Sequence, residues 1–273
     1  MGGPPHCVLR PVLAALNHMT TEDITKEELA LSKEMAQFPM KFCNACFFGD
    51  ASDPSGKVNN GTMTLVRYKG EKFGITNFHV IDAYRKRLAN EPDIKFYIGN
   101  TLIDIEETLF DENEDLDLCT LYLDAYEEKD FGSFGDIPTH FFEIDEFPLA
   151  QVSEGEFVLF GGFPGVWRTR PETNHLVFDS LSTGGTEVAE VTDMNIRCEL
   201  AIDNCLVTMN RHDRALPDDF GGLSGGPMFA RRELSSGVTI FKLAGIIYQH
   251  MPEYDSITIR PVTFINECFH VVS

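Results

Sequence analysis

The stretch Phe220–Phe229 reads FGGLSGGPMF, with four glycines around one serine and an apolar run directly after them. Glycine adopts positive φ without a steric cost, so Ser224 can sit on a sharp, strained turn. On such a turn the backbone N–H groups of Gly222 and Ser224 can converge on one point, as an oxyanion hole for acyl transfer requires. The alternative is a glycine-rich hairpin turn in which the serine only hydrogen-bonds its own backbone.

Length and composition indicate a folded globular protein. The chain has 273 residues, of which 43% are hydrophobic and 11% aromatic. That is enough apolar material for one large domain or two small ones. The formal net charge of −21 argues against nucleic acid and membrane surfaces as partners, because a phosphate binder must supply cations. An acidic surface favours basic partners, or serves only for solubility.

The cysteines and the N-terminus predict a protein of the reducing cytoplasm. Seven cysteines is an odd number, so at least one thiol stays unpaired. We find no signal-peptide pattern and no run of about 18 apolar residues that would span a membrane. Disulfides are rare in the cytoplasm. Cys43 and Cys46 have the spacing of half a zinc site, but no convincing second pair completes it, so we expect buried structural thiols and no metal.

Strand patterns dominate the chain after residue 40. A helix is expected from Thr20 or Thr21 to Phe38, with Pro39 ending it, and a second helix over Pro261–Phe269. Two sets of short strands, separated by a less regular stretch at 124–146, predict an all-β double barrel or sandwich. We therefore divide the chain into an N-terminal extension (1–40), a first barrel (41–135) and a second barrel with a C-terminal helix (136–273). The strands expected in the first set are Phe42–Phe48, Gly61–Tyr68, Phe73–Asn77, Ile94–Ile98, Thr101–Ile105 and Leu116–Leu123, with Glu106–Glu114 as a surface loop. Those in the second set are Phe147–Val152, Glu156–Gly162, Leu176–Leu181, Thr186–Val191, Arg197–Ile202, Met228–Ala230, Val238–Ile247 and Ile257–Ile259.

Two further segments supply possible partners for Ser224. His79 follows the strand that ends in TNF, where an imidazole can act as a general base, or can simply cap the strand. In the segment EDLDLCTLYL, an aspartate that leads into a strand can accept a hydrogen bond from the far imidazole nitrogen. Asp115 and Asp117 both qualify sterically, and we choose Asp117 because the strand begins directly after it.

The motifs Thr-Asn-x-His-Val, Asp-Leu-x-x-Leu-x-Leu and Gly-Leu-Ser-Gly-Gly-Pro follow one another in the order His, Asp, Ser. In this the sequence resembles the trypsin-like serine proteases of the chymotrypsin superfamily (PA clan), and it resembles bacterial HtrA-like and cytosolic trypsin-like domains more than digestive enzymes. GGFPG at 161–165 resembles a segment of the second barrel of such domains, and the resemblance covers about residues 40–270. It implies a chymotrypsin-like double β-barrel with the site in the cleft. It also implies His79 as general base, Asp117 as its orienting acid, Ser224 as nucleophile, and the N–H groups of Gly222 and Ser224 as oxyanion hole.

Two positions depart from the family pattern. Leu223 precedes the nucleophile where many secreted relatives have an acid that pairs with a newly cleaved N-terminus, so activation of that type is not expected. Asp218 occupies the place of the acid at the base of the trypsin pocket, and a carboxylate there favours Lys or Arg before the scissile bond. Alternatively Asp218 belongs to an exposed acidic loop, and Tyr248 or His250 narrows or closes the pocket.

The leading hypothesis is a serine endopeptidase that forms an acyl-enzyme on Ser224 and needs no cofactor. Its partners would be a protein or peptide substrate and a regulatory protein that switches it on. The alternative is a catalytically silent binding module with a protease fold.

Overall fold

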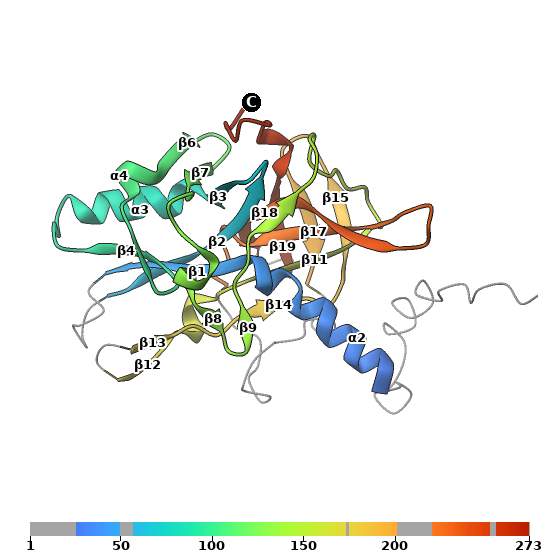
Figure 1. Ribbon diagram of the computed structural model, residues 1–273, viewed down its shortest axis with the longest axis horizontal. Coiled ribbons are helices and arrows are strands. Elements are labelled where there is room, and N and C mark those ends of the chain that lie inside the picture. Colours follow the sequence, from blue (N-terminus) through green and yellow to red (C-terminus); the bar gives the residue numbers. More distant parts are fainter. Residues whose placement is uncertain (1–25, 50–56, 173–174, 201–219, 252–254, 273) are drawn as a thin grey trace, which may run out of the picture.

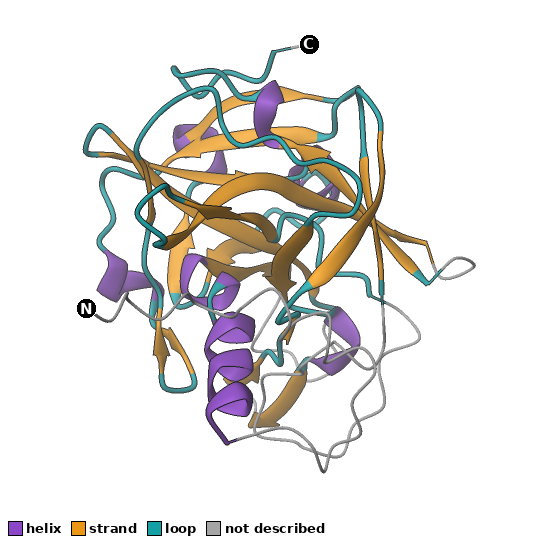
Figure 2. Ribbon diagram, turned by 90° about the vertical axis from the view of Figure 1, so that its right-hand side faces the viewer, coloured by secondary structure: helices purple, strands orange, loops and turns teal. Residues whose placement is uncertain are grey.

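The computed structural model describes residues 26–49, 57–172, 175–200, 220–251 and 255–272. Strands make up most of this part of the chain, and the helices lie at its periphery (Figure 1, Figure 2). Two β-sheets stand side by side, one built from the earlier and one from the later part of the sequence (Figure 1). Asp218 lies outside the described residues.

The first sheet has the strand order β5-β4-β1-β2-β3-β7-β6, and β10 adds to β2 in parallel. Its neighbours along the order are antiparallel, and the hairpin from β2 to β3 turns at Lys69 and Gly70, which both have positive φ. The sheet wraps partly round a core without closing. Its strands are β1 (Cys43–Gly49), β2 (Asn59–Tyr68), β3 (Glu71–Thr76), β4 (Lys95–Ile98), β5 (Thr101–Ile103), β6 (Leu109–Asn113), β7 (Leu118–Tyr122) and β10 (Phe142–Ile144).

The second sheet closes on itself. Its order β11-β15-β16-β19-β18-β17 ends on a strand that pairs again with β11, which completes a six-stranded barrel, and β14 adds to β11 at one end. A closed barrel beside a half-open one confirms the all-β, chymotrypsin-like double-barrel class. Its strands are β11 (Phe157–Gly162), β14 (Leu181–Ser182), β15 (Thr186–Val191), β16 (Ile196–Glu199), β17 (Pro227–Glu233), β18 (Thr239–Met251) and β19 (Ser256–Pro261), and two small hairpins pair β8 (Ser133–Phe134) with β9 (Ile137–Pro138) and β12 (Thr169–Glu172) with β13 (His175–Val177).

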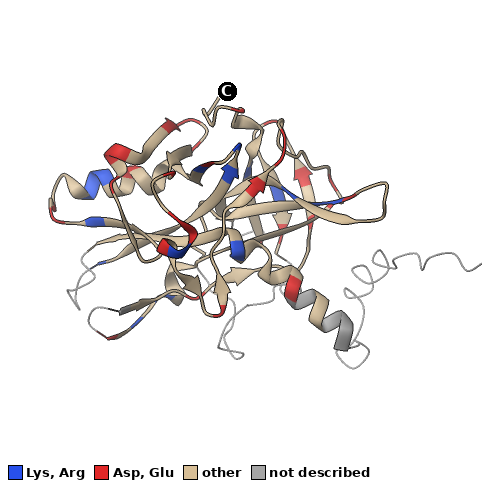
Figure 3. Ribbon diagram, in the orientation of Figure 1, with Lys and Arg blue, Asp and Glu red and all other residues tan. Residues whose placement is uncertain are grey.

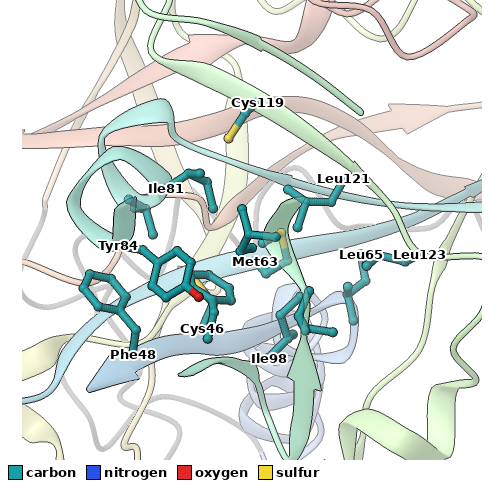
Figure 4. Close-up of a cluster of buried hydrophobic side chains, with 14 of the residues drawn as sticks. Cys46, Phe48, Met63, Leu65, Ile81, Tyr84, Ile98, Cys119, Leu121 and Leu123 are labelled. Carbon is teal, nitrogen blue, oxygen red and sulfur yellow. The ribbon is translucent and has the colours of Figure 1, made fainter. Parts of the chain in front are cut away.

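Each sheet encloses its own hydrophobic core, and the two faces of β2 belong to different environments. Met63 and Leu65 are fully buried in the first core, together with Cys46 and Leu121 (Figure 4). Because side chains alternate along a strand, Thr62 and Thr64 point to the opposite face. That face is also fully buried, since it meets the second barrel. The face of β2 that carries Thr62 and Thr64 therefore lies at the interface between the two barrels.

The N-terminal helix α2 (Lys26–Gln37) ends where expected, just before Pro39, and a 3-10 turn, η1 (Pro39–Phe42), follows it. The expected cap at Thr20–Asp23 lies outside the described residues. The ring of Phe38, between α2 and η1, contacts Phe142 of the first sheet and Phe229 and Phe241 of the second barrel, with centroid distances of 6.5, 5.1 and 4.5 Å. The segment after α2 thus joins the two sheets.

The structure corrects the sequence-based assignment at four segments. The residues after β3 form a helix, α3 (Phe78–Leu88), and the expected acidic loop contains α4 (Ile105–Thr108) and β6. Residues 147–152 are not a strand; Phe147 instead packs its ring on Tyr68 and Phe269. At the C-terminus, the expected helix is only a 3-10 turn, η6 (Val262–Phe264).

The charged residues are distributed over both sheets and their connections (Figure 3). None of the described helices is long and apolar enough to cross a membrane. The strands of the first sheet end at residue 144 and those of the second barrel begin at residue 157. Our division of the chain at residue 135 stays a prediction.

Candidate active site

His79 lies in the first turn of α3, not at the end of a strand. The N-cap residue Asn77 has extended backbone and makes no side-chain capping bond. Instead the backbone N–H of His79 donates to Oδ1 of Asp117 at 2.7 Å. A free N–H in the first turn needs an acceptor, and a carboxylate there also suits the helix dipole. The helix start is thus capped by a residue from another part of the sheet.

The same carboxylate orients the imidazole. Oδ2 of Asp117 lies 2.6 Å from Nδ1 of His79. The Asp117 side chain is 11% exposed, whereas the His79 ring is 50% exposed. A short bond on one ring nitrogen leaves Nε2 as the nitrogen available to the cleft. Asp115, the other acid that we considered, is exposed to solvent.

Asp117 holds an uncommon backbone conformation, with φ of 49°. Aspartate tolerates this left-handed region better than most residues, although it still costs about 1–3 kcal/mol. Two hydrogen bonds fix the turn: Asp117 N–H donates to Glu114 O at 3.1 Å, and Asn77 Nδ2 donates to Asp117 O at 2.8 Å. The asparagine of the histidine motif thereby supports Asp117 directly.

The loop that carries Ser224 is held by its carbonyl groups. Every peptide carbonyl of residues 220–226 accepts a hydrogen bond, with distances between 2.5 and 3.1 Å. Five of the donors come from outside the loop, and three of those five belong to β2. In order from residue 220 to residue 226, the donors are Leu223 N, Gly165 N, Thr62 Oγ1, Gly226 N, Thr62 N, Thr64 Oγ1 and Ile247 N.

The N–H groups of residues 222–226 divide into two sets. Those of Leu223, Gly225 and Gly226 donate to backbone carbonyls. Those of Gly222 and Ser224 donate to no acceptor within the described residues. In a trans peptide the C=O and N–H point in opposite directions. Since the carbonyls of Gly221 and Leu223 are bonded away from the site, these two N–H groups are left available.

His79 and Ser224 line the same cavity, which has a volume of about 550 Å³. Ser224 Oγ donates to the backbone carbonyl of Tyr248 at 3.2 Å. Within the described residues it makes no hydrogen bond to the imidazole. The cavity is lined by His79, Phe220, Gly221, Leu223, Ser224, Ile247, Tyr248, Gln249, His250 and Ile257.

The two pocket residues on β18 also face this cavity. His250 packs its ring on Phe220, with centroids 4.1 Å apart, and Tyr248 lies against the guanidinium of Arg260, 4.8 Å from its ring centre. Both are half-buried and leave the cavity open. Burial lowers the pKa of Arg260.

Sequence analysis missed the polar residues of β2 that contact the serine loop. Asn60, Thr62 and Thr64 have the strand period of two, so they share one face. Asn60 Nδ2 donates to Phe163 O at 2.9 Å, and Arg168 NH1 donates to Asn60 Oδ1 at 2.9 Å. The signal was the alternation of β2, in which Thr62 and Thr64 alternate with the apolar Met63 and Leu65.

No protein-family model and no curated protein matches the chain. Among solved structures, the chain is similar to the Rv3671c protease from M. tuberculosis in its active form. The TM-score is 0.42 and the identity 13%, over 85% of this chain and 81% of that one.

Proposed function

We propose that the protein is a serine endopeptidase with Ser224 as nucleophile, His79 as general base and Asp117 as the acid that orients it. The observation that carries the proposal is the Asp117–His79 hydrogen bond beside a cavity that Ser224 also lines. A nucleophile, a base and an oriented acid are the minimum set for covalent acyl transfer by a hydroxyl. The motif order His, Asp, Ser in the sequence supports the same roles.

The N–H groups of Gly222 and Ser224, which donate to no acceptor in the described part of the chain, supply the remaining part. Buried or partly buried backbone donors are nearly always paired, so two on one loop need an explanation. An oxygen that gains negative charge during the reaction is a suitable acceptor for both. We assign this role to the N–H groups of Gly222 and Ser224.

The reaction begins when Ser224 Oγ attacks the carbonyl carbon of the scissile peptide. Its proton passes to Nε2 of His79, and the carbonyl π electrons move to oxygen, which the two N–H groups stabilise. Breaking of the C–N bond then releases the amine, which takes the proton from His79. Water, deprotonated by the same imidazole, hydrolyses the acyl-enzyme and regenerates the hydroxyl. This sequence requires no metal or organic cofactor.

Tyr248 and His250 stay candidates for the walls of the substrate pocket, because both line the cavity. Asp218 remains part of the proposal only on its position in the sequence. We propose a protein or peptide substrate, a regulatory protein partner and a cytoplasmic location.

The test is covalent labelling of the pure protein by a fluorophosphonate probe. We expect the wild type to label and the Ser224→Ala variant not to label. Ser133→Ala is the matched control, since its hydroxyl is exposed and only contacts Gly135 O in its own hairpin. Failure of the wild type to react, also after addition of candidate partners, would contradict the proposal.

One observation favours the alternative of a silent binding module: Ser224 Oγ donates to Tyr248 O in place of His79. A module of this kind would hold peptides without cleaving them. Incubation with a mixed peptide library separates the two functions, because only the endopeptidase produces new N-termini.

A further inference from the structure

We infer that Thr62 and Asn60 of β2 are positioning residues for the proposed oxyanion hole, so that the first barrel sets the geometry of a loop that belongs to the second. The inference rests on the proposed function. It concerns residues outside the His, Asp and Ser motifs.

Thr62 holds three peptide groups. Its Oγ1 donates to Gly222 O at 2.8 Å and accepts from Phe163 N–H at 3.1 Å. Its backbone N–H donates to Ser224 O at 2.8 Å. The side chain is fully buried, so water cannot replace these bonds. Thr62 thus fixes the peptide units that follow Gly222 and Ser224, next to the two peptide units that carry the N–H groups of the proposed hole.

The side chain of Asn60 lies against Gly222. A Cβ on Gly222 would lie 2.4 Å from Asn60 Nδ2, 2.6 Å from Phe163 O and 2.8 Å from Gly165 N. Asn60 is itself held by its bond to Phe163 O and by Arg168 NH1. Since these neighbours leave no room for a side chain, Gly222 has little freedom to rotate its peptides.

The bonds also set the direction of the N–H groups. Gly165 N–H donates to Gly221 O at 2.5 Å, on the peptide that carries the Gly222 N–H. Rotation of this peptide would break that bond and would move the N–H out of the site. Catalytic geometry is sensitive at this level, because a displacement of about 1 Å costs about 10²-fold in rate.

The experiment compares Thr62→Val, Thr62→Ser and Thr120→Val. Valine keeps the shape of threonine but removes the hydroxyl, whereas serine keeps it. Thr120 is the matched control: it is fully buried in β7 and its hydroxyl donates to a distant carbonyl, Phe269 O, at 2.9 Å. Thr120→Val loses one buried hydrogen bond and Thr62→Val loses two, but only Thr62→Val loses one at the loop that carries Ser224.

We expect Thr62→Val to lower kcat about 10- to 100-fold with KM within about twofold of wild type, and Thr62→Ser to restore most of it. Inhibition by a peptide aldehyde, whose adduct carries the oxyanion, should weaken by a similar factor. Thr120→Val should lose thermal stability, because it too loses a buried hydrogen bond, but should keep kcat and aldehyde affinity. An equal loss in both valine variants, or no loss in either, overturns the inference.

Asn60→Ala provides a second measurement if Thr62→Val does not fold, because Asn60 is only half-buried. It should reduce kcat and aldehyde affinity together, and unchanged values overturn the inference. If the wild type itself neither labels with the fluorophosphonate nor cleaves peptides, the proposed function has failed. If the wild type is active and the variants match it, only the positioning role has failed.

Discussion

The carboxylate of Asp117 binds His79 twice, once at the backbone N–H and once at the ring nitrogen, with distances of 2.7 and 2.6 Å. The bond to the backbone fixes where α3 begins, and the bond to the ring fixes how the imidazole is turned. Start of the helix and orientation of the ring therefore depend on one side chain. A substitution at Asp117 that keeps the bond to the backbone but changes the bond to the ring can therefore separate the effect on the fold from the effect on catalysis.

The change Asp117→Asn should abolish most activity while leaving the fold intact. Asparagine can still accept from the His79 backbone N–H, but its NH₂ group next to Nδ1 stabilises the tautomer in which Nε2 carries the proton. That tautomer cannot accept the proton of Ser224. We expect kcat/KM to fall on the order of 10⁴-fold, as for the same change in the chymotrypsin-type triad, and stability to change by less than about 1 kcal/mol.

Asp115→Asn is the control for this substitution, because Asp115 is two residues away and exposed. It should have wild-type kinetics. Similar losses in both variants would mean that the general negative charge of the segment matters and not the bond to His79. Peptide hydrolysis and thermal unfolding measure the two quantities.

The change Gly222→Ala should remove activity and stability together. Gly222 has φ of 102°, and an added Cβ would meet three atoms at 2.8 Å or less. Gly70 is the matched control, since its φ is 89° but a Cβ there would meet no atom within 4 Å. Gly70→Ala should cost only the backbone strain, about 1–2 kcal/mol, and should leave kcat unchanged. Gly222→Ala should cost more than that, measured by chemical denaturation.

The change Phe38→Ala should destabilise the joint between the two sheets. Phe38 contacts aromatic rings from both. Truncation of a packed phenylalanine costs about 3 kcal/mol or more, which lowers Tm by about 6–12 °C in a domain of this size. Phe110→Ala is the control, because Phe110 is 41% exposed and should cost less. Equal shifts in Tm would show that Phe38 does not hold the sheets together.

The buried cysteines should be inert in the native protein. Cys43, Cys46, Cys119 and Cys198 are buried, whereas Cys268 is exposed. Burial raises the pKa of all four buried thiols, and that of Cys46 and Cys198 to about 12. The thiolate is the reactive form, so iodoacetamide at pH 8 should modify Cys268 and spare the four buried thiols. Peptide mapping by mass spectrometry measures this, with a sample in denaturant as control.

The same thiols should make the fold sensitive to alkali. Their folded pKa lies above the unfolded value of about 8.5, so the folded state favours the protonated form. This contribution is fully present below about pH 8.5, and it is lost progressively as pH rises toward about 12. The free energy of unfolding should therefore fall over this range, and more slowly in the Cys46→Ala variant than in wild type. An equal slope in both would contradict the assignment.

Much of the fold could be predicted because β-strands carry a local signal. The strands expected over Gly61–Tyr68 and Phe73–Asn77 are each encoded in a few neighbouring residues, and the structure confirms both as β2 and β3. The acidic segment before β7 was assigned wrongly as a surface loop, because its interactions are not local in the sequence. Asp111 and Glu112 look like solvated charges, but they bond to His270 and Arg85, which are distant in sequence.

The helix at His79 could not be predicted, because its cap comes from a residue 38 positions later. Likewise, nothing near Thr62 and Thr64 shows that their hydroxyls bond to carbonyls about 160 residues away. The catalytic roles of His79, Asp117 and Ser224 stay predictions. The sequence alone predicted the order of three short motifs. It could not predict the contacts between them, because those form only in the folded chain.

The bonds from β2 to the serine loop bear on how this protein can be divided. Gly222 O and Gly225 O find their donors in the other half of the molecule, so a fragment with only the later strands would leave both without a partner. Because these hydrogen bonds join the two halves, neither half should reach its native form when expressed alone. Mixing the two fragments should restore the native spectrum, as in complementation of a split reporter.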